Sequence, residues 1–441
     1  MYIIIAGAGG VGYSLAKALS YKHNVVVVDK DFNKLNKIND DLDVLTIHGD
    51  IKHPQTYKTL DIKSSDLYIA VTDSDEANLL STLVVEDVVD VKSKVVRLKN
   101  DGFLSSKVLE KLSINYAVFP NLTTAKKVKA LLEFPKANNV KYFHQTDCKL
   151  VSIRVDYLEN YRYVVGDILD SKVVVVGVER DKSFTIVDKD FLLQKKDLIY
   201  FFGEMEYIDK IANMLNNSMP SKIDKVVIFG ANELSQKIAK ELISKGIEIK
   251  IVDKNRELCK EALQNLNGEV TVINSSYNDH NLFEEEGLEQ ADMVISTYFN
   301  DEKNIVKCVE AKEHGVAKVV AVNNDKDYYE LMHMLDVVVV RGSKAGAYYS
   351  ILENISSSMI ITQRHYCGGK AIMFMRKIYS KSEFIGKSIS TLSVKSAVAL
   401  LLRDKEIINL TSDILLQEGD VITLFGSIDS NEELERWIYE L

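Results

Sequence analysis

The chain has 441 residues, of which 46% are hydrophobic and 27% charged, and its formal net charge is −9. Its length predicts three or four domains, each able to bury a core. The negative charge disfavours nucleic acid and anionic lipid as direct partners, and no apolar run approaches the ~20 residues of a membrane span.

Residues 1–135 alternate short apolar runs with amphipathic stretches. The chain opens with a predicted strand rather than a signal peptide, and the apolar runs are YIIIA, NVVVVD, DVLTIHG, LYIAVT, KVVRL and YAVFP. Such near-continuous apolar runs are typical of strands buried on both faces of a parallel sheet, and the stretches 11–20 and 76–88 are long enough for crossover helices. The region predicts a Rossmann-like, doubly wound α/β domain.

A β-rich segment follows at 140–219, after the break PKANN. Its runs KLVSIRVDYL, KVVVVGVER, SFTIVD and DLIYFFG, closed by a short helix at 207–215, predict a small α+β module. After a linker, the α/β pattern resumes over 222–362, and a second β-rich module occupies 365–441. The predicted architecture is two Rossmann-like doubly wound parallel sheets, each followed by a small α+β module.

The two halves of the chain repeat one another. Residue pairs that recur at spacings of 223 to 225 include Gly7 and Gly230, Asp29 and Asp253, Thr72 and Thr297, and Arg180 and Arg403. The phrases LLQKKD and LLQEGD recur as well. A unit this long exceeds the roughly 20–50 residues of a solenoid repeat, so each half is predicted to be one copy of a two-domain unit.

Gly7, Gly9 and Gly12 form a glycine loop in the context that binds nucleotides. They follow the run YIIIA and open the helix predicted near Val11. The first glycine allows a tight turn, the second lets the backbone approach a pyrophosphate, and the third packs helix against sheet, while the helix N-terminus attracts the anion. Asp29 ends the next strand, 22 residues after Gly7, where a carboxylate accepts hydrogen bonds from a ribose. The alternative is a glycine turn that only packs a helix, with Asp29 as a helix N-cap.

Further polar residues follow the ends of neighbouring strands, where ligands bind in such sheets. Asp50 follows the third run, Thr72 and Asp73 follow the fourth, and Arg97 lies inside VVRLKN, where it can meet phosphates. These four are candidate ligand contacts; alternatively, Asp50 caps a helix and Arg97 forms an ion pair. A carboxylate at Asp29 repels a 2′-phosphate, which disfavours NADP but does not separate NAD from ATP or ADP.

The second copy keeps Gly230 but departs from the motif around it. The second and third glycines become Asn232 and Ser235, Glu233 adds a negative charge, and Ala321 takes the place of the cation in VVRLKN. Each change weakens anion binding, so this copy is predicted to bind dinucleotide poorly or not at all.

No catalytic constellation emerges from the sequence. The eight histidines are scattered, the four cysteines form no CxxC pair, and neither a GxSxG elbow nor a P-loop lysine motif is present. His53 lies nearest the predicted crevice and is interpreted either as a proton donor or as a solvated loop histidine. We therefore predict no catalytic centre and no metal site, and a protein of a reducing cytoplasm that is not an enzyme.

The motif stretches together carry a family resemblance. They are IIIAGAGGVG, VVVVDK, TIHGD, VTDSDEAN and VVRLKN in the first α/β domain, with LLQKKDLIYFFG and LLQEGDVITLFG in the small modules. The chain resembles, over essentially its whole length, the TrkA family of peripheral cytosolic subunits of bacterial Trk potassium-uptake systems. These are two fused RCK (KTN) units, which implies RCK N-terminal domains at 1–135 and 222–362 and RCK C-terminal domains at 140–219 and 365–441.

The resemblance also implies a ligand, a partner and a location. The ligand is NAD or NADH, with ATP or ADP at the same site; in the family the second unit can also carry a nucleotide. The implied contacts are Gly7, Ala8, Gly9, Gly10, Val11, Asp29, Thr72, Asp73 and Arg97. The implied assembly is a homo-oligomeric ring beneath a membrane-embedded potassium transporter, at the inner face of the membrane and without lipid insertion.

The expected function is therefore regulatory. A nucleotide-dependent change of conformation would gate potassium transport through the membrane partner. Two alternatives remain: an NAD-dependent oxidoreductase on the same sheet, and a nucleotide-independent scaffold with a vestigial glycine loop.

Overall fold

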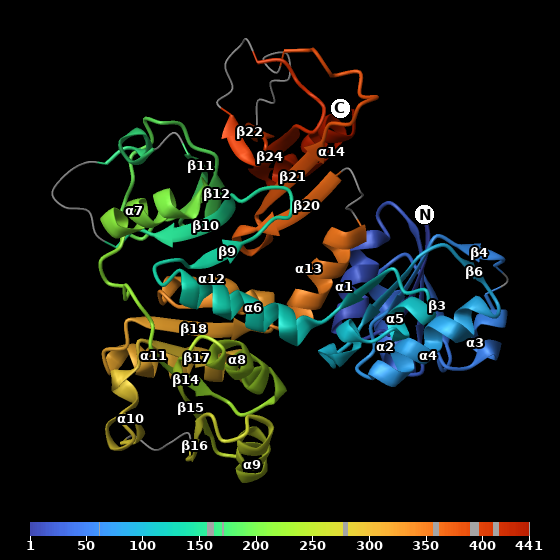
Figure 1. Cartoon of the computed structure of the whole chain (residues 1–441). Helices are drawn as coiled ribbons and strands as arrows, with labels where there is room; N and C mark the ends of the chain where they lie inside the picture. The colour runs from blue at the N-terminus through green and yellow to red at the C-terminus, as the bar shows by residue number, and fades with distance from the viewer. Residues whose placement is uncertain are drawn as a thin grey trace. The chain divides into compact units, whose positions relative to one another are not determined.

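The computed structural model describes residues 1–60, 62–156, 163–169, 172–276, 281–355, 361–388, 397–408 and 414–440. These residues form two six-stranded sheets, two five-stranded sheets and a two-stranded ribbon (Figure 1). The chain divides into two compact parts: unit 1 is Met1–Thr124 with Arg341–Ile355, and unit 2 is Ala125–Val340 with Ser356–Leu441. Within the described ranges, none of the helices has the length and apolar character that crossing a membrane requires.

The first six-stranded sheet is parallel throughout, as the sequence predicts. Its strand order is β3-β2-β1-β5-β7-β8. The chain builds the sheet outward from β1 in one direction and from β5 in the other, so the topological switch point, where a doubly wound sheet opens a crevice, lies between β1 and β5. The strands are β1 (Tyr2–Ala6), β2 (Asn24–Asp29), β3 (Leu45–His48), β5 (Leu67–Ala70), β7 (Lys94–Arg97) and β8 (Tyr116–Val118). The ribbon pairs β4 (Ser64–Ser65) with β6 (Asp90–Val91).

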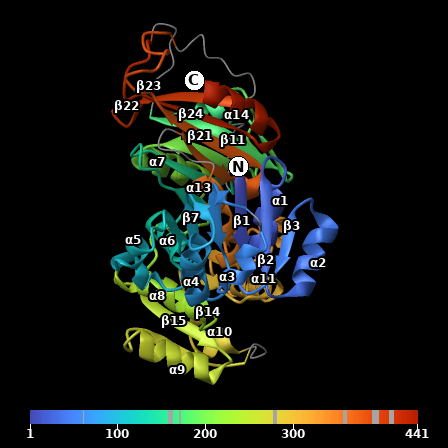
Figure 2. The same ribbon diagram turned by 90° about the vertical axis from the view of Figure 1, so that its right-hand side faces the viewer.

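Helices cover both faces of this sheet because its strands alternate their side chains between two cores. Ile3 and Ile5 of β1 belong to one core, and Ile4 and Ala6 to the other. The first core is completed by α1 (Gly10–Leu19), α2 (Phe32–Asp41) and α13 (Ser343–Ile355). The second is completed by α3 (Pro54–Lys58), α4 (Asp75–Glu86), η1 (Asp101–Ser105) and α5 (Val108–Lys111). Figure 2 shows α1 and α2 beside β1, β2 and β3.

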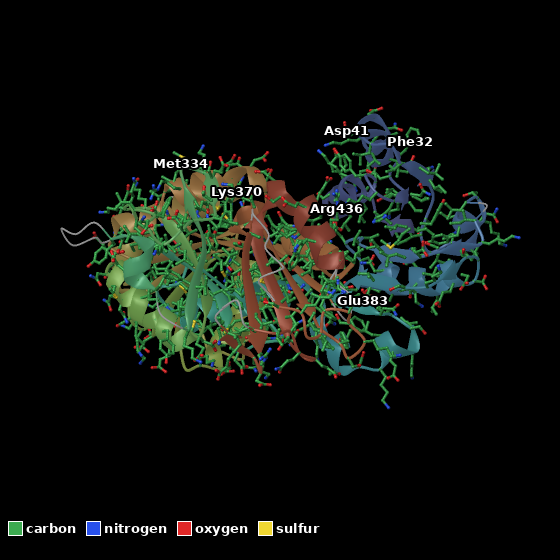
Figure 3. The ribbon with its side chains drawn as sticks, turned by 90° about the horizontal axis from the view of Figure 1, so that it is seen from above. Phe32, Asp41, Met334, Lys370, Glu383 and Arg436 are labelled. Atoms are coloured by element: carbon green, nitrogen blue, oxygen red, sulfur yellow. The ribbon has the colours of Figure 1, made fainter. Side chains whose placement is uncertain are left out.

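Both ends of α2 are tied to the rest of unit 1. The ring of Phe32 meets His48 of β3 edge to face, with centroids 5.7 Å apart. At the other end, Asp41 accepts a 2.8 Å hydrogen bond from the hydroxyl of Tyr13 on α1. Phe32 and Asp41 are labelled in Figure 3. These contacts fix both ends of α2 within unit 1.

The second six-stranded sheet repeats the first, with the order β16-β15-β14-β17-β18-β19. Its strands are β14 (Lys225–Phe229), β15 (Glu248–Asp253), β16 (Thr271–Asn274), β17 (Met293–Ser296), β18 (Lys318–Asn323) and β19 (Val338–Arg341). One face carries α8 (Glu233–Ile243) and α9 (Arg256–Asn265). The other carries α10 (Leu282–Glu285), η3 (Leu288–Gln290), α11 (Asp301–Glu313), η4 (Lys326–Tyr328) and α12 (Tyr329–Met334).

The last helix of each α/β copy belongs to the core of the other copy. Helix α13 closes the second copy in the sequence, yet its Ala347 and Ile351 are fully buried in the core of unit 1, beside α1 (Figure 1). Helix α6 (Pro120–Glu133) closes the first copy, yet from Ala125 onward it belongs to unit 2, where Val128 packs in the core of the second sheet. The two halves of the sequence are therefore not independent folding units.

Lys318 fastens the end of α6 within unit 2. Its side chain is fully buried, and its ammonium donates to the carbonyl oxygens of Leu131, Pro135 and Ala137 at 3.2, 2.5 and 3.0 Å. Carbonyl groups at a helix C-terminus carry partial negative charge and lack partners within the helix, so a cation is favourable there. Burial lowers the pKa of Lys318 to about 7.

The small modules are antiparallel five-stranded sheets of one topology. The first, β12-β11-β13-β10-β9, contains β9 (Asn139–Lys141), β10 (Lys149–Arg154), β11 (Val173–Arg180), β12 (Ser183–Thr185) and β13 (Leu198–Gly203). The second, β20-β21-β24-β22-β23, contains β20 (Ile361–Tyr366), β21 (Ala371–Lys377), β22 (Ala397–Arg403), β23 (Glu406–Ile408) and β24 (Val421–Ser427). Their helical segments are η2 (Val165–Ile168), α7 (Met205–Leu215), η5 (Cys367–Gly369), η7 (Ile428–Ser430) and α14 (Asn431–Glu440).

The same ion pair closes both small modules. Arg180 donates to both carboxylate oxygens of Asp197 at 2.7 Å, and Arg403 donates to both oxygens of Asp420 at 2.9 Å. Both aspartates are nearly inaccessible, at 2% and 1% exposure. A bidentate pair of this kind satisfies the buried carboxylate, so the repeated R-D…D spacing in the sequence reflects a structural role.

The two small modules share a hydrophobic core within unit 2. Aromatic rings meet across it: Tyr200 lies 5.3 Å from Tyr366, and Phe202 lies 5.1 Å from Phe425. Figure 1 shows the green and the red sheets that supply them. Lys370, labelled in Figure 3, joins the modules by donating to Glu179 at 3.0 Å.

His333 on α12 adjoins this charged group. Burial lowers the pKa of His333 to about 4; the carboxylate of Glu179 opposes the shift and the guanidinium of Arg154 reinforces it. The Arg154 guanidinium lies 3.1 Å from the ring Nδ1. Because a guanidinium only donates, this contact requires a neutral imidazole that accepts.

Candidate functional site

The glycine loop between β1 and α1 is built as the sequence predicts. Gly7 has φ +114°, a conformation that favours glycine. A Cβ on Gly12 would lie 1.8 Å from the carbonyl oxygen of Gly7, so a side chain at that position is excluded. Gly9 is the N-cap of α1 and supplies no side-chain hydrogen bond. The N–H groups of Gly10 and Val11, which begin α1, are thus available to an anion.

Asp29 holds the loop through its carboxylate. It accepts hydrogen bonds from the N–H of Ala8 at 2.6 Å and from the N–H of Asp31 at 2.9 Å. It does not cap α2, because Asp31 is the N-cap of that helix. Asp253 makes the same bond to Ala231 at 2.9 Å in the second copy, whose loop sequence differs. These bonds therefore shape the loop whether or not the loop binds a nucleotide.

Asn78, on α4, orders the ends of β5 and β7, and the sequence reasoning missed its importance. It is 1% exposed. Its Oδ1 accepts from the backbone N–H of Thr72 at 3.0 Å and from the Thr72 hydroxyl at 2.6 Å, and its Nδ2 donates to the carbonyls of Thr72 and Arg97. Both donors of Thr72 are thus engaged within the protein. The signal was present in the repeat, since Asn304 occupies the equivalent place on α11.

Arg97 and Asp73 meet at the strand ends. The guanidinium Nη1 of Arg97 donates to Asp73 at 3.0 Å; the arginine side chain is 9% exposed and the aspartate 87%. Among the described residues, the Nε of Arg97 is a buried donor without a hydrogen-bond partner. A buried cation that is only partly satisfied, beside an open strand end, is suited to an anion.

Two lysines extend the positive charge around Asp73. Burial would raise the pKa of Asp73, but the hydrogen bond and charge of Arg97, with Lys99 and Lys344 nearby, hold it below its usual value. A hollow of about 390 Å³ lies beside Asp73 and is lined in part by Lys99 and Phe103. It lies at the ends of β5 and β7, on the opposite side of β1 from Asp29.

Asp50 and His53 form a separate loop after β3. The carboxylate of Asp50 accepts from the N–H of Lys52 at 3.0 Å and lies 3.9 Å from the ring of His53. Asp50 does not cap α3, whose N-cap is His53. The His53 side chain is 70% exposed. The contacts of Asp50 thus lie within its own loop, and His53 faces solvent.

Side chains fill the corresponding loop of the second copy. Asn232 is the N-cap of α8, where its Oδ1 accepts from the N–H of Ser235 at 3.1 Å, and its Nδ2 donates to the carbonyl of Thr297 at 2.8 Å. The hydroxyl of Ser235 lies 2.7 Å from that of Thr297. The amide oxygen of Asn232 therefore occupies the place beside the helix N-terminus that an anion would need.

The hydrogen bonds correct two of the predicted correspondences between copies. Asn304 accepts from the N–H of Tyr298 and donates to the carbonyl of Val322, both at 2.8 Å, as Asn78 does with Thr72 and Arg97. The counterpart of Thr72 is thus Tyr298 rather than Thr297, and the counterpart of Arg97 is Val322 rather than Ala321. Sequence alignment erred because the connections before β17 and β18 differ in length. The conclusion that the second copy lacks this cation is unchanged.

Two domain families match the chain. The TrkA-N domain matches residues 3–120 and 226–341, and the TrkA-C domain matches residues 373–439. The TrkA-N matches coincide with the two six-stranded sheets, and the TrkA-C match covers the second five-stranded sheet except for β20. The first five-stranded sheet has the same strand order as the second.

The similar proteins include full-length relatives. Trk system potassium uptake protein TrkA homolog 1 of Methanosarcina mazei is 25% identical over 453 residues, which cover 99% of this chain and 100% of the relative. Trk system potassium uptake protein TrkA of Halomonas elongata is 25% identical and covers 96% of this chain and 95% of its own.

Solved structures share the fold over all or most of the chain. The GsuK RCK domain superposes with a TM-score of 0.62 at 17% identity, covering 100% of this chain and 95% of its own. The GsuK channel bound to NAD gives a TM-score of 0.62 at 17% identity, covering 100% and 79%. GsuK bound to ADP gives 0.51 at 14% identity, covering 80% and 68%.

Proposed function

We propose that this chain, which belongs to the family defined by the TrkA-N domain, is a nucleotide-binding regulatory subunit of a potassium uptake system. Family membership supports the link to potassium transport, since the full-length relatives are named as Trk potassium uptake proteins. The two glycine loops then indicate where a regulatory nucleotide would bind.

The observation that carries the proposal is the difference between the two glycine loops. The first copy starts α1 from Gly9 with no side-chain cap, whereas the second fills the same position with Asn232. An uncapped helix N-terminus leaves N–H groups without partners and carries partial positive charge, which together bind a phosphate group. One chain would thus bind one nucleotide, at the first copy.

The proposed ligand is NAD or NADH, with ATP or ADP able to occupy the same site. GsuK, which shares the fold, has been solved with NAD and with ADP. The proposed contacts are Gly7, Ala8, Gly9, Gly10, Val11, Asp29, Thr72, Asp73 and Arg97. In this assignment the amides that begin α1 hold the diphosphate, Asp29 accepts from the adenosine ribose and Arg97 neutralises phosphate charge.

The hollow beside Asp73 suits the second half of a dinucleotide. Asp29 lies on the β2 side of β1, and the hollow lies on the β5–β7 side, so a dinucleotide whose diphosphate rests on the loop would reach both. Its volume of about 390 Å³ falls within the usual range for a small-molecule pocket. A mononucleotide would leave it empty, so dinucleotides and mononucleotides would make different contacts with β5 and β7.

Regulation would follow from this difference in contacts. A ligand shifts a conformational equilibrium only through unequal affinity for the two states. A nucleotide that bridges the α1 loop and the ends of β5 and β7 favours the arrangement in which these elements are close. In the proposed assembly, a homo-oligomeric ring on the cytoplasmic face of the membrane passes this preference to a membrane-embedded potassium transporter.

Potassium uptake, paired with nucleotide titration, tests the proposal. Cells that lack this chain would be complemented with wild-type protein or with the Gly9→Asn variant, and uptake would be followed by ⁸⁶Rb⁺. Wild-type protein should restore nucleotide-dependent uptake, and the variant should restore uptake that no longer responds. Equal uptake with and without the chain would refute a transport role.

Binding should be measured on the full-length chain rather than on separated halves, because unit 1 needs residues 341–355 from the second half. Calorimetry with NAD, NADH, ATP and ADP should give one site per chain. Failure of all four to bind would favour a scaffold, and steady turnover of NADH with a small substrate would favour an oxidoreductase.

A further inference from the structure

Helix α13 brings residues of the second copy to the nucleotide loop of the first. Its start is fixed within unit 1 by two hydrogen bonds: Ser343 donates to the side chain of Asn121 at 2.5 Å, and Thr124 donates to the carbonyl of Arg341 at 3.0 Å. One turn later, Ala347 is fully buried beside α1. The first residues of α13 are therefore held in place at the mouth of the loop.

Lys344, the second residue of α13, lies over Gly10. Its Cδ is 4.0 Å from the point where a Cβ on Gly10 would be, so the lysine stem passes the first residue of α1. The ammonium group is close enough to Asp73 to act on its charge, as described above. Lys344 thus places its stem beside the α1 N-terminus, and its positive charge acts on Asp73, which follows β5.

The second copy has no equivalent of this arrangement. Glu233 replaces Gly10 as the first residue of α8, and the counterpart of Arg97 is Val322. The first turn of α6, the helix exchanged in the opposite direction, reads PNLT and carries no charged side chain. Among the described residues, the bare loop, the buried arginine and the lysine of the exchanged helix therefore occur together in the first copy and not in the second.

We propose that Lys344 is a phosphate-binding residue of the first-copy site, so that a nucleotide is held by both copies of the repeat at once. The proposal rests on the nucleotide-binding function proposed above. A buried donor that lacks a partner, the Nε of Arg97, points independently to an anion at this place. In the absence of ligand, Asp73 serves as the counter-ion, and a diphosphate competes with it for the surrounding cations.

The consequence is a direct link between ligand binding and the exchanged helix. A diphosphate that contacts both Gly10 and Lys344 stabilises the docking of α13 against α1. Because α13 is covalently joined to the second copy, binding of a nucleotide at the single site would affect the conformation of both halves of the chain.

Calorimetry on the full-length chain with ADP, ATP and NAD tests the proposal through Lys344→Met. The change removes one charge from an exposed side chain. It should raise the Kd of each nucleotide about 5- to 30-fold, the range for one charged contact at a partly exposed site. Lys344→Arg keeps the charge and should bind within about threefold of wild type. Lys17→Met, at the exposed far end of α1, is the matched control for the loss of one positive charge and should bind as wild type.

Hydrogen exchange supplies a second readout that does not depend on affinity alone. At saturating ADP, amides of α13 should exchange more slowly in the wild-type chain than without ligand, and this protection should be lost or reduced in Lys344→Met. Wild-type affinity in Lys344→Met, or equal loss in Lys17→Met, would overturn the assignment while leaving the nucleotide site intact. A wild-type chain that binds no nucleotide would instead refute the proposed function.

Discussion

Replacing Gly9 by asparagine should strongly weaken nucleotide binding while leaving the fold intact, because the second copy already carries this substitution. Gly9 has extended backbone, with φ −69° and ψ −178°, and no atom lies within 4 Å of a Cβ added there. The asparagine side chain is therefore accommodated, and by analogy with Asn232 it should accept a hydrogen bond from the first turn of α1.

The magnitudes separate stability from binding. Asparagine and glycine differ as N-caps by a few tenths of a kcal/mol, so the free energy of unfolding should change by less than about 0.5 kcal/mol. Hydrogen bonds to a charged group contribute about 1.5–3 kcal/mol each. Displacing a phosphate from one or two amides at the start of α1 should thus cost about 3 kcal/mol, or more than about 100-fold in Kd.

Isothermal titration of the Gly9→Asn chain with NAD, NADH, ATP and ADP measures the loss, and thermal unfolding without ligand measures the stability. Nucleotide affinity within threefold of wild type would refute the proposed role of the loop. The reverse change, Asn232→Gly, tests the same reasoning in the second copy. It should not create a second site, because Val322 supplies no cation; a second tight site would show that the bare loop alone suffices.

Three further predictions follow from individual contacts. Asp29→Asn should weaken nucleotide binding by about 1.5–3 kcal/mol, whereas Asp253→Asn, which disturbs the same loop bond in the second copy, should leave calorimetric affinity unchanged; equal effects would show that the loss is not local to the first-copy site. Asp197→Asn should lower the free energy of unfolding by about 3 kcal/mol in urea denaturation, because it breaks a buried bidentate pair, and a change below about 1 kcal/mol would contradict that role. The folded pKa of His333, about 4, lies below its unfolded value, so the unfolded chain binds the extra proton and stability falls as the pH drops from about 6.5 to 4. His333→Asn should remove about 1.5–3 kcal/mol of that pH dependence, allowing for solvent screening, and identical pH profiles for the two chains would contradict the assignment.

Much of the fold was predictable because its signals are local. Near-continuous apolar strands, helix-length spacers and a glycine turn before a helix are properties of adjacent residues, and they correctly predicted both parallel sheets and the small modules. The family assignment was also correct, because its motif stretches are contiguous. The altered loop of the second copy was visible for the same reason, since Asn232 and Ser235 stand where the glycines stand in the first.

The sequence predicted the candidate site less completely, because its parts come from distant segments. The roles of Asn78 and Arg97 depend on how the ends of β5 and β7 align, and differences in the length of the connections before β17 and β18 shifted the predicted counterparts in the second copy by one residue. Asp29 was predicted to accept hydrogen bonds from a ribose; the structure adds a role that the sequence did not indicate, because its carboxylate holds the loop through the N–H of Ala8.

By itself, the sequence determined the two sheets, the position of the uncapped loop and the asymmetry between its two copies, because residues close in the chain specify each of these. Only the tertiary structure decided that α6 and α13 exchange cores, and hence that Lys344 lies over Gly10, 334 positions away in the sequence. The physical reason is that an amphipathic helix needs an apolar face to cover but does not specify which one. Two similar sheets in one chain offer equivalent faces, and the choice between them depends on chain connections and on contacts such as the hydrogen bond between Ser343 and Asn121.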